Sequence, residues 1–170
     1  MNLVFDTYYF DKDKANTICL AFENWESPFP DRKFSEIKEG VEEYVPGQFY
    51  RRELPCILSL LEKIKPQIDK ISCIIIDGFV YLDDDMSPGL GKHLYDALNS
   101  EIPVIGVAKT NFATVEKYKL ALKRGSSETP LYISSVGIDM NKAHDLIRKM
   151  HGEHRMPTLL KKVDILTRQF

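Results

Sequence analysis

The apolar run Ile71-Ser-Cys-Ile-Ile-Ile-Asp-Gly78 constrains the fold more than any other part of this 170-residue chain. Its continuous β-branched residues are typical of a central strand in a parallel sheet, buried on both faces. A helical period over 48–64 precedes this strand, and a second short buried strand is expected at 102–108. Strands that alternate with helices in this way predict an α/β fold, a mixed sheet flanked by helices.

The other elements are predicted from alternation, turn residues and helix periodicity. The remaining strands are expected as a hairpin of 2–10 and 17–22, an edge piece around 25–34, and a second hairpin of 118–122 and 131–134. The remaining helices are expected over 88–99, 141–150 and 157–168. Ser87 and Pro88 are typical of an N-cap followed by proline at the first helical position.

Three carboxylates fall at positions where a solvated charge is not expected. Asp6 interrupts the apolar run 2–10, Asp77 ends the strongest apolar run, and Glu53 lies early in the helical segment. An unpaired carboxylate inside a core costs several kcal/mol, so we expect the three to share a cation. A hard divalent ion such as Mg²⁺ takes oxygen ligands. The sequence therefore indicates metal-assisted chemistry, and phosphate is the expected target.

Each of these positions also has a simpler interpretation. Asp6 could pair with a lysine on the neighbouring strand, Glu53 could be a solvated helix residue, and Asp77 could form a turn with Gly78. The acidic triplet Asp83-Asp84-Asp85 is more typical of a solvated turn than of a calcium loop, and His151-Gly-Glu-His154 lacks the spacing of a zinc motif.

Composition bounds the remaining possibilities. The formal net charge is only −2, yet residues 141–170 carry seven Lys and Arg against three Asp and Glu. That basic end could meet phosphates or could be a solvated helix face. No apolar stretch approaches the roughly 18 residues of a membrane span. The three cysteines lie in apolar contexts without CxxC spacing, which suits structural packing in a reducing cytoplasm. We expect one cytoplasmic domain over 1–170, without a membrane partner.

Several motifs occur in order along the chain. They are Tyr44-Val-Pro-Gly-Gln-Phe-Tyr-Arg-Arg-Glu-Leu-Pro55, Asp77-Gly78, Ile102-Pro-Val-Ile-Gly-Val-Ala-Lys109, and Arg155-Met-Pro157 followed seven residues later by Asp164. Together they resemble the endonuclease V family over nearly the whole chain. His93 matches a histidine in the helix between the second and third motifs.

This resemblance implies a ribonuclease H-like fold and a Mg²⁺-dependent endonuclease. We separately expect Mn²⁺ to substitute for Mg²⁺ and the protein to be a monomer. The family cuts DNA or RNA near hypoxanthine, the base left when adenine is deaminated. By position, the implied metal ligands are Asp6, Glu53 and Asp77. The implied catalytic partners are Lys109, near the phosphate, and Asp164. The implied substrate contacts are the wedge Tyr44, Val45 and Pro46, the pocket residues Gly47 and Gly78, and His93.

The chain departs from the family pattern mainly on the base-reading side. Glu43 stands where the wedge begins with proline, and Phe79-Val80 replaces a glycine-rich pocket floor. The family's His-Pro-Arg gives way to the acidic triplet, its Ser-Pro-Gly-His appears as Ser134-Ser-Val-Gly137, and its N-terminal extension is missing. We therefore expect a divergent, shortened member. Two alternatives remain: a nuclease with another structured or mismatched substrate, and a non-catalytic nucleic-acid-binding relative.

Overall fold

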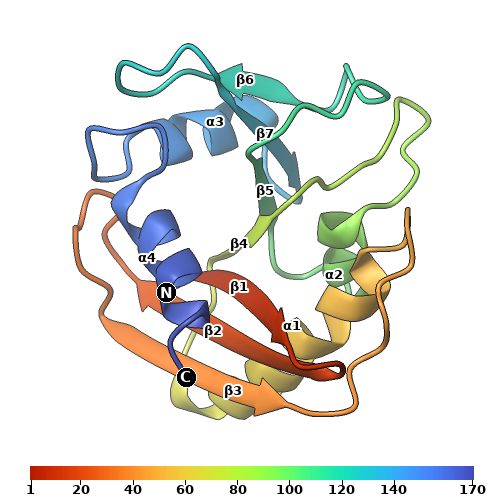
Figure 1. The fold of residues 1–170 in the computed structure, drawn as a ribbon. Coiled ribbons are helices and arrows are strands. Elements are labelled where there is room, and N and C mark those ends of the chain that lie inside the picture. Colours follow the sequence, from red (N-terminus) through yellow and green to blue (C-terminus); the bar gives the residue numbers. More distant parts are fainter.

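The computed structural model describes residues 1–170 and contains one seven-stranded mixed sheet in the order β3-β2-β1-β4-β5-β7-β6 (Figure 1). The strands are β1 (Asn2–Phe10), β2 (Lys14–Phe22), β3 (Arg32–Lys38), β4 (Cys73–Asp77), β5 (Val104–Ala108), β6 (Leu120–Leu122) and β7 (Leu131–Val136). The helices are α1 (Tyr50–Ile64), followed by the 3₁₀ turn Lys65–Gln67, α2 (Leu90–Ala97), α3 (Met140–Arg148) and α4 (Thr158–Thr167). The predicted α/β class and element order are confirmed.

The centre of the sheet is parallel and its flanks are antiparallel. β4 pairs in parallel with β1 on one side and with β5 on the other. β1, β2 and β3 form an antiparallel meander, while β7 runs antiparallel to both β5 and β6. Cys73 to Ile76 of β4 are all buried, as expected for a strand covered on both faces.

Alternating residues of the central strands pack into two separate hydrophobic cores, one on each face of the sheet. Val4, Ile75 and Val107 pack with residues of α3 and α4 on one face. Leu3 and Ile74 pack with residues of α1 and α2 on the other face. Because successive side chains of a strand point to opposite faces, each strand residue can be assigned to a face from these clusters.

Two predicted boundaries are wrong. The edge strand is Arg32–Lys38 and not 25–34, because Pro28 and Pro30 fall in an irregular stretch before the polar alternation that forms β3. Helix α2 begins at Leu90 with Gly89 as N-cap. Pro88 instead forms a bridge with Tyr81, and the Ser87 N–H donates to the Asp83 side chain.

Candidate metal centre and base pocket

Asp6 and Asp77 stand at the same level on neighbouring parallel strands. The pairing of β1 with β4 aligns Val4 with Ile75, and each carboxylate lies two residues further along its strand. Side chains two residues apart point to the same face of a sheet. Both carboxylates therefore follow Val4 and Ile75 towards the face covered by α3 and α4. Since paired strands are about 4.8 Å apart, this register makes the two side chains neighbours.

The turn after Asp77 depends on two glycines that allow close backbone approach. Gly78 has a φ of 130°, which a residue with a side chain rarely adopts. A Cβ added to Gly106 of β5 would lie only 2.4 Å from the carbonyl oxygen of Gly78. Glycine at both positions therefore lets the chain leave β4 directly behind the carboxylate of Asp77.

Lys109 and Asp164 complete the side chains around this pair. Lys109 follows β5 two residues after Val107, and Asp164 lies on α4. Both line one small pocket together with Asp6 and Asp77. Asp164 also faces two cations of its own helix: Arg168 at 3.4 Å and Lys161 at 4.0 Å. The structure thus brings together four of the five residues that the sequence predicts as catalytic.

Burial and the neighbouring negative charges raise the pKa of Asp6 and of Asp77. The pKa of Asp6 is raised to about 7, first by burial and then by the negative charges of Asp77 and Asp164. Asp77 is accessible to solvent but closely surrounded by protein atoms, and this desolvation raises its pKa. Lys109 opposes the shift at both groups. Carboxylates crowded in this way favour a bound cation, which would compete with the protons.

Glu53 approaches from the opposite face of the sheet. It belongs to the first turn of α1, is 4% exposed, and accepts a hydrogen bond of 2.6 Å from the Tyr9 hydroxyl. Burial raises its pKa to about 8, the Tyr9 hydrogen bond opposes this, and the charges of Asp6 and Asp77 add to it. The pKa of Glu53 therefore depends on the charges of both aspartates, although Glu53 does not line their pocket.

Tyr9 was not singled out from the sequence. It is three residues from Asp6, so it points to the other face of β1, and its partner Glu53 comes from a distant helix. The guanidinium of Arg52 covers the Tyr9 ring at 3.6 Å. The available signal was a tyrosine at an inward-facing strand position, where a buried hydroxyl needs a partner.

The oxygen donors suit Mg²⁺, although no three His, Cys, Asp or Glu side chains stand close enough to hold a metal ion by themselves. Mg²⁺ commonly uses one or two carboxylates and completes its shell with waters and substrate phosphate oxygens. Asp6 and Asp77, adjacent and on one face, match that requirement. Ligation by Glu53 as well stays a prediction.

Arg155 supports the backbone at Lys109. Its guanidinium donates to the carbonyl oxygens of Lys109 and Pro130, the latter at 2.8 Å, while its Nε is buried without a partner. The sequence marked Arg155 only as part of a motif. Its position indicates that it holds the segment that carries Lys109.

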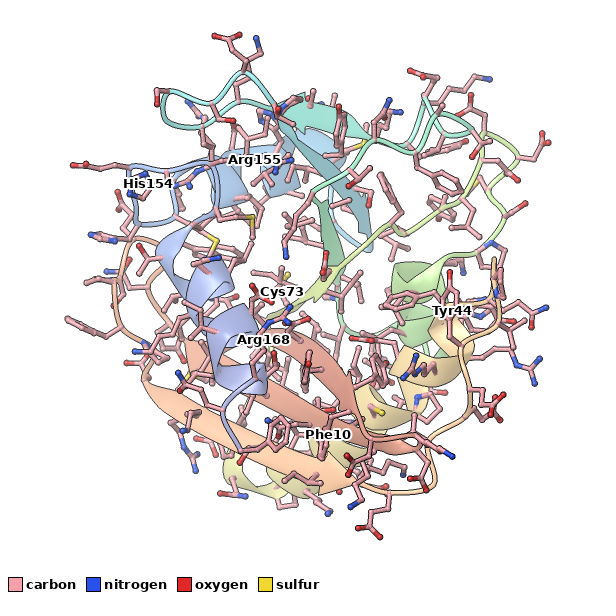
Figure 2. All side chains as sticks on the ribbon, in the orientation of Figure 1. Phe10, Tyr44, Cys73, His154, Arg155 and Arg168 are labelled. Atoms are coloured by element: carbon pink, nitrogen blue, oxygen red, sulfur yellow. The ribbon has the colours of Figure 1, made fainter.

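A second pocket, of about 400 Å³, is lined by three of the six predicted substrate-contact residues, Tyr44, Gly47 and Gly78. Its ten lining residues are Tyr44, Gly47, Phe49, Tyr50, Gly78, Phe79, Leu82, Gly89, Leu90 and Phe112. Val45 and Pro46 are exposed and do not line it. His93 stacks on Tyr50 with ring centroids 3.7 Å apart. Tyr44 lies on the α1 and α2 side of the molecule, away from His154 and Arg155 (Figure 2).

The two residues expected to narrow this pocket behave differently. Phe79 lines it and packs against Phe112 with ring centroids 5.9 Å apart. Val80 is fully buried and does not line the pocket. It packs so closely against Gly91 that a Cβ added to Gly91 would clash with it. Only Phe79 therefore affects the room for a base.

The remaining sequence candidates have structural partners. Asp83 accepts from the N–H groups of Asp85 and Ser87, and Asp84 accepts from those of Glu116 and Lys117. The Ser87 side chain, followed by the Ser87 N–H, lowers the pKa of Asp83, and the two N–H groups lower the pKa of Asp84. Both aspartates fit the solvated-turn interpretation. All three cysteines are free and buried. No helix combines the length and apolarity needed to cross a bilayer.

The chain resembles solved structures over almost its full length. A Ciona intestinalis endonuclease V, solved with an inosine-containing 24-mer DNA, matches with a TM-score of 0.80 and 18% identity, covering 99% of this chain and 84% of that one. The catalytic domain of human endonuclease V matches with a TM-score of 0.75 and 21% identity, covering 99% and 80%. The fold is ribonuclease H-like: a mixed sheet covered by helices on both faces.

Sequence comparison is more specific. The family model for endonuclease V matches residues 4–165, and the chain belongs to the endonuclease V family. An endonuclease V from Nostoc punctiforme is 33% identical over 144 residues, which cover 72% of this chain. The match spans 62% of that relative's length.

Proposed function

We propose that this protein is a metal-dependent endonuclease that hydrolyses a phosphodiester bond near a deaminated base, inosine, in DNA or RNA. The observation that carries the proposal is the register of β1 and β4, which sets Asp6 beside Asp77 on one face. Lys109 and Asp164 line the same pocket. Family membership and the inosine-containing DNA in the Ciona complex support the choice of substrate.

Asp6 and Asp77 would hold Mg²⁺, or Mn²⁺ in its place, and Glu53 would contribute from the opposite face. The ion would supply activated water and neutralise charge on the phosphate oxygens. Lys109 would place a positive charge beside the phosphate, where it gains strength as negative charge develops. Asp164 would hold a water or proton near the same phosphate, with Arg168 orienting its carboxylate.

The aromatic pocket would receive the displaced base. Tyr44, Val45 and Pro46 form an exposed segment at its rim, suitable for filling the gap that a flipped base leaves in a duplex. Phe79 and Phe112 supply ring faces against which a base can stack. Gly47 has a φ of 77°, a conformation that favours glycine, so the segment can turn sharply beside the pocket. His93 would act through Tyr50, on which it stacks.

Two observations favour the alternative of a different structured or mismatched substrate. Phe79 occupies part of the pocket, and Glu43 places a negative charge beside the exposed wedge segment. A pocket with less room would accept a smaller or differently oriented base. The base specificity is thus a separate question from the phosphodiester chemistry.

Residues 1–170 would act as one domain, which the family match over 4–165 supports. We expect a monomer located in the cytoplasm. Gel filtration with light scattering tests the first of these expectations, and fractionation of the source cells tests the second.

Cleavage of matched oligonucleotides tests the proposal. Inosine-bearing DNA and RNA, the unmodified sequences and a mismatched duplex are compared in Mg²⁺, with Asp77→Asn as the inactive control. We expect cleavage near inosine that the control abolishes. Equal cleavage of unmodified strands would remove the inosine assignment, preferential cleavage of the mismatch would favour the alternative substrate, and binding without any cleavage would favour a non-catalytic relative.

A further inference from the structure

A basic groove of about 700 Å³ adjoins the carboxylate pocket on the side away from the aromatic pocket. Its lining residues are Gly152, His154, Arg155, Met156, Thr158, Lys161, Lys162, Ile165 and Leu166. Four of these nine residues are basic or histidine, and none is Asp or Glu. The groove therefore concentrates positive charge in a chain whose formal net charge is −2.

The groove is continuous with the carboxylate pocket. Met156 lines both, and Lys161 of the groove lies one helical turn before Asp164 of the pocket. His154 and Arg155 lie on the α3 and α4 side of the molecule, whereas Tyr44 lies on the α1 and α2 side (Figure 2). The carboxylates thus stand between the aromatic pocket and the groove.

Two lysines in the groove have little else to bind. Lys161 is 60% exposed, and its nearest acidic atom is Asp164 Oδ2 at 4.0 Å. Lys162 forms no ion pair, and its ammonium lies 5.9 Å from the centre of the exposed Phe29 ring. Arg155, by contrast, is already committed to the carbonyl oxygens of Lys109 and Pro130. Lys161 and Lys162 are the cations available to an anionic ligand.

We propose that this groove binds the phosphate backbone of the nucleic-acid strand on the side of the cut bond away from the recognised base. The inference rests on the proposed function. If the cut phosphodiester bond lies at Asp6 and Asp77, the same strand continues past Met156 into the groove. Lys161 and Lys162 contact phosphates there and carry no base specificity. This assigns a role to the basic end that the sequence left unexplained.

Salt dependence of binding tests the groove directly. Affinity for a labelled inosine-bearing oligonucleotide is measured by fluorescence anisotropy over a range of salt concentrations, in an Asp77→Asn background that prevents cleavage. Each lost phosphate contact lowers the slope of log K against log salt by about 0.7 for single strands and about 0.9 for duplex. We expect K161A/K162A to lower the slope by about 1.4 to 1.8 and to weaken binding about tenfold at low salt.

The matched control is K65A/K70A, which removes two exposed lysines before β4, at the opposite end of that strand from Asp77. It should leave slope and affinity unchanged, and thermal melting should show both double variants folded. Oligonucleotides shortened on each side of the cut in turn give a second readout. Removing the flank that lies in the groove should weaken binding to the parent protein but not to K161A/K162A.

Three results would overturn the groove assignment. They are an unchanged salt slope in K161A/K162A, an equal loss of slope and affinity in the control, and an unchanged affinity of the parent for both truncated oligonucleotides. These outcomes are independent of base specificity, because the slope is also measured with the unmodified oligonucleotide. Loss of inosine preference with the expected slope would overturn only the substrate assignment. Absence of any binding would overturn both.

Discussion

The Tyr9 hydroxyl donates a hydrogen bond of 2.6 Å to Oε2 of Glu53. This contact connects the face of β1 opposite to Asp6 with the first turn of α1. Both groups are shielded from bulk solvent: Glu53 is 4% exposed, and Arg52 covers the Tyr9 ring. A buried carboxyl that keeps its partner is oriented, whereas one without a partner is costly. Tyr9 thus acts as a positioning residue for Glu53.

Tyr9→Phe should destabilise the protein by about 1 to 3 kcal/mol, because it leaves the Glu53 carboxyl buried without its donor. Urea denaturation measures the loss. Tyr8→Phe is the matched control, since Tyr8 points to the other face of β1 and makes no hydrogen bond to Glu53. If the two variants were equally stable, Tyr9 would have no such role.

Stability without divalent ions should fall as the pH rises. Unfolded Asp and Glu release their protons near pH 4, whereas folded Asp6 and Glu53 hold theirs until about pH 7 and 8. Between these limits the folded state binds more protons, so the free energy of unfolding decreases with pH.

Urea denaturation in EDTA at pH 5, 7 and 9 measures that dependence. Asp6→Asn should flatten it, because the amide does not titrate. Mg²⁺ should stabilise the parent more at pH 9 than at pH 5, because it competes with fewer protons. A pH profile identical in the parent and in Asp6→Asn would contradict the assignment.

Arg155→Ala should reduce cleavage about tenfold to a hundredfold, because the segment that carries Lys109 loses its anchor and a displacement near 1 Å costs about that much. Arg155→Lys should rescue little, since a lysine cannot donate to two carbonyl groups in a fixed fork. A double-mutant cycle with Lys109→Ala separates position from charge. Additive effects of the two substitutions would show that Arg155 acts elsewhere.

Phe112→Ala should weaken binding of the inosine-bearing strand by about 1 to 3 kcal/mol if a base stacks in the aromatic pocket. Ile37→Ala removes an apolar side chain that is 54% exposed on the edge strand β3 and serves as control. Binding is measured in the Asp77→Asn background. An effect of equal size on an oligonucleotide without the modified base would mean that Phe112 contacts the strand but does not read the base.

The central architecture could be predicted because its signals are local. The buried run that forms β4, the helical period of α1 and the strand that forms β5 each lie within one segment. β3 was misplaced because its strand pattern is carried by charged residues, which suit an exposed edge but resemble a loop. Ser87-Pro88 has the local chemistry of a helix start, yet the bridge of Pro88 to Tyr81 delays the helix to Leu90.

The site was only partly predictable for a different reason. Asp6 interrupts an apolar run and Asp77 ends one, so both stand out in the sequence as candidate site residues. Their shared level depends on the register between two strands separated by about a third of the chain. The aromatic pocket and the Tyr9–Glu53 contact depend on how α1 and the loop before α2 pack, and no local pattern encodes those long-range contacts.

The single-turnover rate of cleavage as a function of Mg²⁺ concentration, in the parent and in Asp6→Asn and Asp77→Asn, tests the metal centre most directly. An inosine-bearing oligonucleotide is the substrate, and thermal melting confirms that each variant is folded. We predict saturable Mg²⁺ dependence in the parent and a loss of at least about a hundredfold in each variant. Cleavage that continues in EDTA, or that survives both substitutions, would contradict a metal centre built on Asp6 and Asp77.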